Sequence, residues 1–140
     1  MSDWINIPKD IEPYQGFVYC ITNLTNDKKY IGKKFFWRIK KLQPLKGKIN
    51  KRHFKVESDW KDYYGSSPKL HEDIDKYGVD CFERRILRLC KNKWDCAYYE
   101  LVEQINQSVL FKDEYYNEVV NVRLRKRPNL KNGEKIRKGV

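Results

Sequence analysis

Two short apolar runs near the start of the chain predict a β-hairpin. Residues 16–22 read Gly-Phe-Val-Tyr-Cys-Ile-Thr, a β-branched and aromatic composition typical of a strand. A second extended run begins at Lys29 and continues through Tyr30-Ile31-Gly32. Residues 23–28 between them are rich in turn formers, with Asn26-Asp27 at the centre, so we expect the two strands to pair.

The period of the pattern then changes and predicts a helix at residues 68–77. Ser66-Ser67-Pro68 has the composition of a helix start, and Gly78 has that of a helix end. Apolar side chains lie on one side of this helix, so the remaining polar ones, including His71, are interpreted as helix surface.

The second half of the chain predicts a third strand and a second helix. Residues 82–89 alternate as a strand does, with apolar character on both sides. In residues 94–107 the large apolar side chains recur at three- and four-residue steps, which indicates a helix. The order favours an α/β (α+β) domain with a small, mainly antiparallel three-stranded sheet flanked by helices.

Length and composition indicate a single folded domain. The chain has 140 residues, of which 40% are hydrophobic and 14% aromatic, so it has material for one packed core and is not globally disordered. We expect a leader at residues 1–15, a domain at 16–122 and a basic tail at 123–140 that is flexible when alone.

The charge of the chain favours a polyanionic partner. The formal net charge is +11, and residues 33–55 contain ten Lys and Arg and no acid. Pro44 and Gly47 interrupt this segment, so we expect one short helix or turn followed by a mobile basic loop that contacts phosphates. Nucleic acid is the first candidate; a solvated basic surface and attraction to an anionic membrane are the alternatives.

Neither a membrane span nor a signal peptide is expected. No run of about eighteen apolar residues occurs, and the first twenty positions contain Asp3, Asp10 and Glu12. The protein is therefore interpreted as intracellular. The spacing of the four cysteines fits neither a zinc site nor a disulfide scaffold, which favours free and mostly buried thiols.

Two phenols and one carboxylate are the candidates for chemistry. Tyr19 and Tyr30 lie on the two paired strands, so their rings are able to meet on one face of the sheet. Glu100 is in the middle of an apolar helix, where an inward carboxylate is costly unless it is used. A phenol with a pKa of about 10 is a weak base unless cations favour its anion, which gives a role to nearby basic residues.

The order of several short motifs resembles the GIY-YIG family of nucleases. Val18-Tyr19 followed by Tyr30-Ile31-Gly32 is similar to the paired signature of that family, although Phe17 stands where the first glycine is usual. A three-residue match alone has little value, but the agreement continues from Gly16 to Asn121. The further matching segments are Lys33, Arg52-His53-Phe54-Lys55, Gly65-Ser66-Ser67-Pro68-Lys69-Leu70, Tyr77-Gly78, Phe82-Glu83-Arg84-Arg85-Ile86-Leu87, Glu100 and Tyr116-Asn117.

The resemblance implies a DNA endonuclease that uses one Mg²⁺ or Mn²⁺ ion to hydrolyse a phosphodiester. It makes Tyr19 the general base, Tyr30 a hydrogen-bonding partner of water or phosphate, and Glu100 the single protein ligand of the metal, with Glu103 as the fallback. Asn117 braces the site. Residues expected to contact nucleic acid are Lys33, Lys34, Lys40, Arg52, His53, Ser66 and Ser67.

The resemblance leaves the catalytic cation open. Relatives carry an arginine at the position where this chain has Lys40. Arg38 is the nearest arginine and the first choice, while Arg52 and Lys40 are its rivals. Stand-alone nucleases of phages and mobile elements are the most similar relatives in organisation, which implies the host cytoplasm as the place of action.

Two other functions are compatible with the same residues. A noncatalytic nucleic-acid-binding domain of this fold would bind DNA without cutting it. A basic structural protein of a ribonucleoprotein would prefer RNA and would not depend on Glu100. The pattern does not decide between a monomer and a homodimer, and it indicates neither the target specificity nor whether one or both strands are cut.

Overall fold

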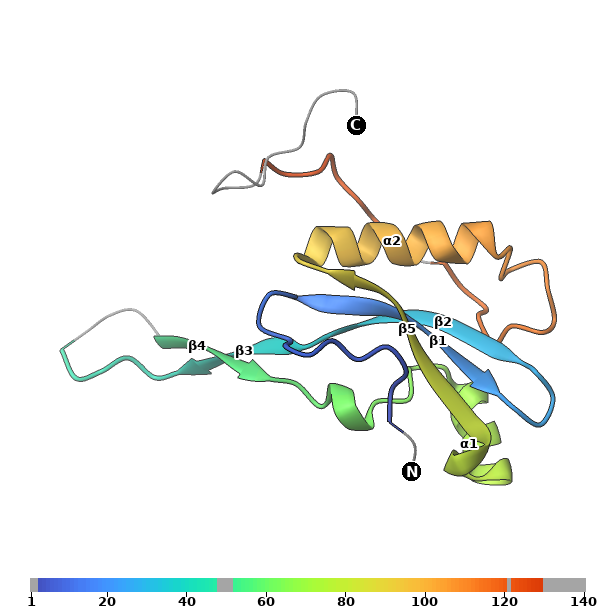
Figure 1. Ribbon diagram of the computed structural model, residues 1–140. Coiled ribbons are helices and arrows are strands. Elements are labelled where there is room, and N and C mark those ends of the chain that lie inside the picture. The colour runs from blue at the N-terminus through green and yellow to red at the C-terminus, as the bar shows by residue number, and fades with distance from the viewer. Residues whose placement is uncertain (1–2, 48–51, 121, 130–140) are drawn as a thin grey trace.

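A three-stranded antiparallel sheet forms the centre of the protein. The computed structural model describes residues 3–47, 52–120 and 122–129. The strands are β1 (Gly16–Asn23), β2 (Lys29–Phe35) and β5 (Phe82–Cys90), in the order β2-β1-β5. Helix α2 (Lys93–Asn106) covers one face of this sheet, and helix α1 (Pro68–Tyr77) lies on the other side (Figure 1). The predicted fold class is confirmed.

The central strand β1 contributes side chains to cores on both faces of the sheet. Phe17, Tyr19 and Ile21 enter the larger core, and Val18 enters the smaller core under α2. A strand with both faces covered reads as a continuous apolar run, which is why residues 16–22 were recognisable. The larger core also contains Trp4, Phe36, Trp60, Tyr64, Leu70, Phe82, Ile86 and Tyr116, and the smaller one contains Ile31, Cys90, Cys96 and Val109.

The pairing of β1 with β5 changes its register at one point. Val18 pairs with Arg88 but Tyr19 pairs with Ile86, so one residue of β5 is extra at this point.

Arg84 of β5 is a buried arginine. It is only 1% exposed, and its Nη1 donates to the carbonyls of Lys61 and Tyr63, each at 2.9 Å. Alternation alone assigned Arg84 to one side of the strand without indicating that its charge is buried.

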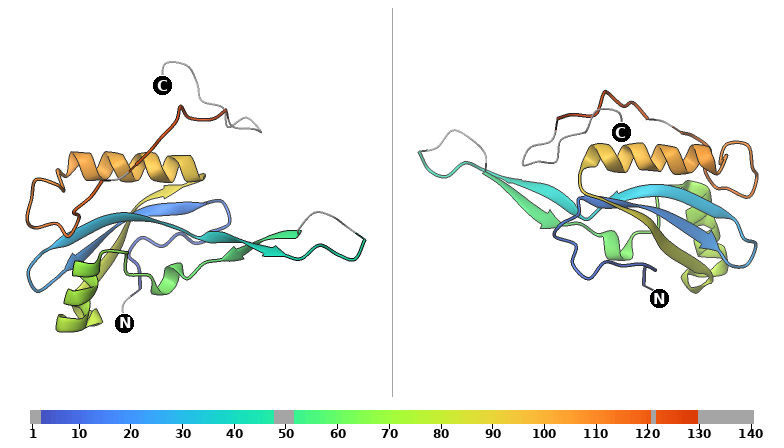
Figure 2. Two further views of the ribbon diagram at one scale, coloured as in Figure 1. Left: turned by 180° about the vertical axis from the view of Figure 1, so that it is seen from behind. Right: turned by 45° about the horizontal axis from the view of Figure 1, so that its top comes forward.

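The predicted secondary structure of residues 33–55, one short helix or turn followed by a loop, is wrong. β2 continues to Phe35, and the following segment forms a second, two-stranded sheet of β3 (Trp37–Leu42) and β4 (Arg52–Glu57). This hairpin extends away from the central sheet in all three views (Figures 1 and 2). Apolar side chains at Trp37, Ile39 and Leu42 support strand pairing, and the high charge of the segment obscured that pattern. Residues 48–51 lie outside the described residues.

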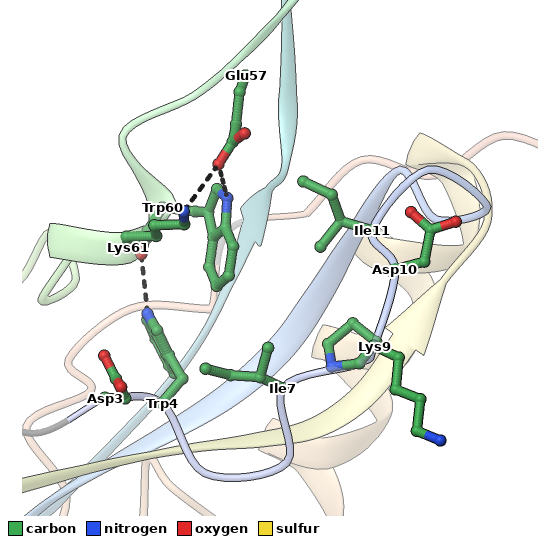
Figure 3. A pocket seen from close by; sticks show the side chains of 10 residues that line it. Asp3, Trp4, Ile7, Lys9, Asp10, Ile11, Glu57, Trp60 and Lys61 are labelled. Carbon is green, nitrogen blue, oxygen red and sulfur yellow. Dashed lines mark hydrogen bonds and ion pairs between the residues drawn. The ribbon is translucent and has the colours of Figure 1, made fainter.

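The segment expected to be a leader packs against the domain. Ile5 N–H donates to the Arg84 carbonyl at 2.7 Å and the Ile5 carbonyl accepts from Ile86 N–H at 2.9 Å, which covers part of the outer edge of β5. Trp4 is 4% exposed and its indole N–H donates to the Trp60 carbonyl at 2.8 Å. Figure 3 shows Trp4 at the border of a pocket of about 490 Å³ between this segment and residues 57–61.

Part of the predicted basic tail is attached to the start of α2. Arg127 forms two hydrogen bonds with the Asp95 carboxylate, at 2.9 and 3.0 Å. The Trp94 indole N–H donates to the Arg125 carbonyl at 2.8 Å. The described part of the tail therefore has fixed contacts, and the expectation of flexibility for residues 130–140 falls outside the described residues.

Both α-helices in the described part of the chain begin with side-chain caps. Ser67 Oγ accepts from Leu70 N–H at 3.3 Å, and Asn92 Oδ1 accepts from Asp95 N–H at 2.8 Å. Gly78 ends α1 with φ of 91°, a conformation that favours glycine.

Neither of the described α-helices has the length and apolar character that crossing a bilayer requires. All four cysteines are free; Cys90 and Cys96 are buried, and the other two are partly buried.

Trp4→Ala is expected to lower the free energy of unfolding by about 3–5 kcal/mol, because it opens a cavity beside Phe17 and Tyr19 and removes a buried hydrogen bond. Chemical denaturation measures the loss. The control Leu24→Ala changes a side chain that is 61% exposed and should stay within about 0.5 kcal/mol of the wild type. A loss below about 1 kcal/mol for Trp4→Ala would contradict the place of this residue in the core.

Candidate active site

Tyr19 and Gly32 form a close contact across β1 and β2. The two residues are directly paired in the sheet. A Cβ atom built on Gly32 would lie 2.5 Å from the Tyr19 hydroxyl oxygen and 2.7 Å from Tyr19 Cζ. Glycine is therefore required at position 32 because the phenol passes over its Cα to the edge of the sheet.

Tyr30 lies on the same face as Tyr19, as the strand pairing predicts. The ring centroids are 6.2 Å apart, and the Tyr30 hydroxyl is 3.2 Å from Ser66 Oγ. Gly65 packs against both phenols: its Cβ would lie 3.2 Å from Tyr30 Cε2 and 3.3 Å from the Tyr19 hydroxyl. Gly65 also has φ of 81°, so the turn before α1 needs glycine for both space and conformation.

Glu100 approaches the site from the other face of the sheet. Strand alternation places Lys33 on the α2 side and Gly32 on the tyrosine side of β2. The Lys33 ammonium is 3.4 Å from Glu100 Oε1, and the Glu100 side chain is 19% exposed. β2 is an edge strand, and the charge of Glu100, paired with Lys33, raises the pKa of both Tyr19 and Tyr30 on the other face.

The electrostatics of the three acidic groups are coupled. Burial raises the pKa of Tyr19 well above its usual value, and Tyr63, Tyr30 and Glu100 raise it further. Burial also raises the pKa of Tyr30, an effect that the Ser66 hydrogen bond opposes and Glu100 increases. The pKa of Glu100 is raised by burial and lowered by Lys33. Both tyrosines are therefore neutral hydrogen-bond donors at neutral pH, and additional positive charge is needed to make either one a base.

Asn117 and Gln104 hold the edge strand beside the site. Asn117 Oδ1 accepts from Ile31 N–H at 3.0 Å, and Asn117 Nδ2 donates to the Ile31 carbonyl at 2.8 Å. Gln104 of α2 donates to the same carbonyl at 3.0 Å. The Asn117 amide thus replaces a neighbouring strand next to Gly32, and both amides are buried.

Lys34 and Arg38 add positive charge on the tyrosine side of β2. The Lys34 ammonium is 2.6 Å from Asp59 Oδ1 and 4.1 Å from the centroid of the Tyr63 ring, which packs edge-on against Tyr19. The Lys34 hydrogen bond lowers the pKa of Asp59, and the charge of Arg38 contributes to the shift. Lys33, Lys34 and Arg38 together line a pocket of about 270 Å³.

The three rival cations differ in their distance from the site. Arg38 is the second residue of β3, while Lys40 lies farther along the same strand and Arg52 pairs with Leu42 at its far end. With a rise of about 3.3 Å per residue, the backbone at Leu42 and Arg52 is about 17 Å beyond Trp37. The backbone therefore places Arg38 at the root of the hairpin, in a pocket with Lys34 and Asp59, and leaves Lys40, Arg52 and the exposed His53 farther along the hairpin.

The two serines before α1 have different environments. Ser66 is exposed and contacts Tyr30, whereas Ser67 is 8% exposed and caps the helix. His71, interpreted from the sequence as helix surface, has a ring nitrogen 2.7 Å from the Gly65 carbonyl. Ser66 is thus the exposed serine of the pair, and His71 supports the Gly65 turn.

The donor set of the site fits a hard divalent cation held by one carboxylate. Within residues 3–47, 52–120 and 122–129, no three His, Cys, Asp or Glu side chains cluster as metal ligands. Mg²⁺ keeps several waters and is commonly bound through one or two carboxylates together with substrate phosphates. Glu100, partly buried and opposite the phenols, is the residue that would hold such an ion.

Sequence reasoning assigned no role to Tyr63, Gly65 or Gln104, although Gly65 begins one of the matching motifs. Tyr63 lies in a short polar and aromatic segment, and Gln104 lies in a helix. Neither residue belongs to a motif with a distinctive spacing, so no local signal in the sequence indicates their contacts. Gly65 precedes the Ser-Ser-Pro helix start, and a glycine at that place is a recognisable signal for a positive φ.

Comparison with known proteins identifies the family of the chain. The family model described as "Putative endonuclease segE, GIY-YIG domain" matches residues 3–120. The chain is 33% identical over 102 residues to "Putative endonuclease segE" of Enterobacteria phage T4, a match that covers 72% of this chain and 39% of the relative. No solved structure matches the chain significantly. The family match extends over most of the chain, which confirms the resemblance: the chain belongs to the GIY-YIG endonuclease family.

Proposed function

We propose that this protein is a DNA endonuclease that hydrolyses phosphodiester bonds with the help of one Mg²⁺ or Mn²⁺ ion. The observation that carries the proposal is the packing of Tyr19 and Tyr30 on one face of β2 at Gly32, with Glu100 paired to the neighbouring Lys33 on the other face. The relative from phage T4 is described only as an endonuclease, and the chain spans 39% of its length, so substrate and metal are inferred from the site.

Each group of the site has a task that phosphodiester hydrolysis requires. Tyr30, with Ser66 beside it, donates a hydrogen bond to a phosphoryl oxygen. Tyr19 positions the attacking water and accepts its proton as the phenolate. The phenol first loses its own proton to solvent, which requires the positive charge of the site to offset the burial that raises its pKa. Glu100 holds the metal ion, which when bound stabilises charge on the phosphoryl oxygens and lowers the pKa of a bound water.

Lys33 acts both at the Glu100 carboxylate and at the DNA. Its ammonium compensates the Glu100 charge, which burial otherwise makes unfavourable. At the same border of β2, the partly exposed Lys33 ammonium also contacts a DNA phosphate. Arg38 is the cation that approaches the reacting phosphate from the tyrosine side.

Asn117 has a supporting role: its two hydrogen bonds to Ile31 keep β2 in place beside Gly32. Lys33, Lys34 and Ser66 contribute phosphate contacts at the site, and Lys40, Arg52 and His53 contribute them from the hairpin. Ser67 remains in the helix cap.

Glu100→Gln is expected to lower metal-dependent nicking of supercoiled plasmid by about 100-fold or more, because the neutral amide is a poor ligand for Mg²⁺. DNA binding, measured by gel shift, should persist. Glu103→Gln is the matched control one turn along the same helix and should retain activity. Full nicking by Glu100→Gln would refute the metal assignment, and binding without nicking by the wild type would indicate a noncatalytic domain.

Arg38→Ala is expected to lower kcat by about 100-fold, because it removes the charge that stabilises the phosphoryl oxygens in the transition state. Lys40→Ala and Arg52→Ala should raise KM and leave kcat near the wild-type value, since both backbones lie farther along the hairpin. Steady-state cleavage of a short duplex separates the two effects. A loss of kcat with Arg52→Ala but not with Arg38→Ala would transfer the catalytic role to Arg52.

Gly32→Ala is expected to abolish most of the cleavage activity while the protein remains folded. The added Cβ would meet the Tyr19 hydroxyl at 2.5 Å, so the phenol must move from the edge of the sheet. We expect at least a roughly 100-fold lower kcat, with a circular dichroism spectrum like that of the wild type. Leu24→Ala is the control, because Leu24 lies just beyond β1 and is 61% exposed. Unchanged activity in Gly32→Ala would show that the position of Tyr19 is not critical.

A further inference from the structure

The β3–β4 hairpin is a two-stranded ribbon in which most of the described side chains are exposed to solvent. Arg38, Ile39, Lys40 and Lys41 are consecutive exposed residues of β3. The ribbon extends beyond the end of the central sheet (Figures 1 and 2). A two-stranded ribbon is marginally stable in water on its own, so an exposed one is suited to contact with a partner.

The two faces of the ribbon differ. Trp37, Ile39, Lys41, His53 and Lys55 share one face. At its root, the Trp37 indole N–H donates to the Tyr14 carbonyl at 2.9 Å, and the Lys55 ammonium lies 4.1 Å from the Trp37 ring centroid and 2.9 Å from Glu12 Oε2. We call this the anchored face, because its root is attached to the N-terminal segment.

The opposite face carries Arg38, Lys40, Phe54 and Val56, with Leu42 at its far end. We call it the free face only because Arg38, Lys40 and Phe54 are exposed to solvent there; the Phe54 ring also has an interaction of its own. Cross-strand pairs place Lys40 beside Phe54 and Arg38 beside Val56. The Phe54 side chain is 44% exposed although it is large and apolar. A lysine and an exposed aromatic residue side by side provide one group for a phosphate and one for a base edge.

The free face continues directly into the candidate active site. Arg38 shares a pocket with Lys33, Lys34 and Asp59 at the root of the ribbon. Lys34 in turn lies over the Tyr63 ring, which packs against Tyr19. A nucleic acid with one phosphate at the tyrosines therefore has its next segment along the free face.

The dimensions of the ribbon fit a groove of duplex DNA. Each strand has six residues, which corresponds to a length of about 20 Å. The major groove of B-DNA is about 12 Å wide and admits a two-stranded β-ribbon, whereas the minor groove is about 6 Å wide. On the ribbon's described residues the charge is strongly positive, with Glu57 at its root as the acid.

We propose that the β3–β4 ribbon enters the major groove of duplex DNA beside the scissile phosphate, with its free face toward the bases. This inference rests on the proposed nuclease function and makes duplex DNA, rather than single-stranded DNA or RNA, the substrate class. Lys40 holds a backbone phosphate, Phe54 contacts base edges, and Arg38 remains at the reacting phosphate.

The first test compares the two faces of the ribbon. The double variant Lys40→Ser/Phe54→Ser changes the free face, and Ile39→Ser/Lys41→Ser is its control, removing one lysine and one exposed apolar residue from the anchored face of the same ribbon. The affinity of the full chain for a short fluorescent duplex is measured by anisotropy in a Glu100→Gln background at one fixed salt concentration. We expect the free-face variant to bind about tenfold or more weakly, and the control to change less than about threefold.

The second test identifies the groove without changing the protein. A duplex whose pyrimidines carry bulky groups at the 5-position has a filled major groove, and a minor-groove ligand such as netropsin fills the other groove. Binding should weaken at least about tenfold on the first duplex and change little with the minor-groove ligand. The single strand of the same sequence should bind more weakly than the duplex.

Three results would overturn the inference. Equal weakening by both double variants would indicate only general attraction between charges. Blocking by the minor-groove ligand alone would assign the wrong groove, and tighter binding of the single strand or of an RNA duplex would assign the wrong substrate class. Failure of the nuclease proposal is separate, because it appears as an absence of metal-dependent cleavage in the wild type while duplex binding by the ribbon persists.

Discussion

The contact between the Tyr19 hydroxyl and the bare Cα of Gly32 is the constraint on which the site depends. It places the hydroxyl of Tyr19, whose side chain is only 1% exposed, directly against the backbone of the edge strand β2. Gly65 provides the same freedom from the opposite side, with Tyr30 between them. The site is therefore built by leaving out side chains, and the packed core around Tyr19 holds its ring in one orientation.

The same geometry explains why the acidic groups are held in their neutral or compensated forms. Burial raises the pKa values of Tyr19, Tyr30 and Glu100, and Lys33 opposes the effect at Glu100. The two phenols lie on one face of the sheet, and on the other face Glu100 pairs with Lys33 of the edge strand β2. Asn117 and Gln104 cover the backbone of Ile31, and this leaves the border at Gly32 and Lys33 for phosphate and metal.

The structure separates a rigid body from an extended arm. In the body, Arg84 joins β5 to the segment before α1 and lies between the rings of Trp4 and Tyr64, at 4.7 and 4.1 Å from their centroids. The arm is the β3–β4 ribbon, whose anchored face is attached through Trp37 and Lys55. Fixing only one face of the arm gives the other face a defined direction relative to the active site.

The sequence by itself determined the hairpin of Tyr19 and Tyr30, the limits of α1, the strand from Phe82 and the helix of Glu100, because period and turn residues are local properties. It also indicated the family through motif order. Tertiary structure alone decided that Glu100 pairs with Lys33 of β2, that Arg84 and Trp4 are buried, and that residues 37–57 include a ribbon. These features depend on register and on packing between segments distant in the chain, and no local pattern contains that information.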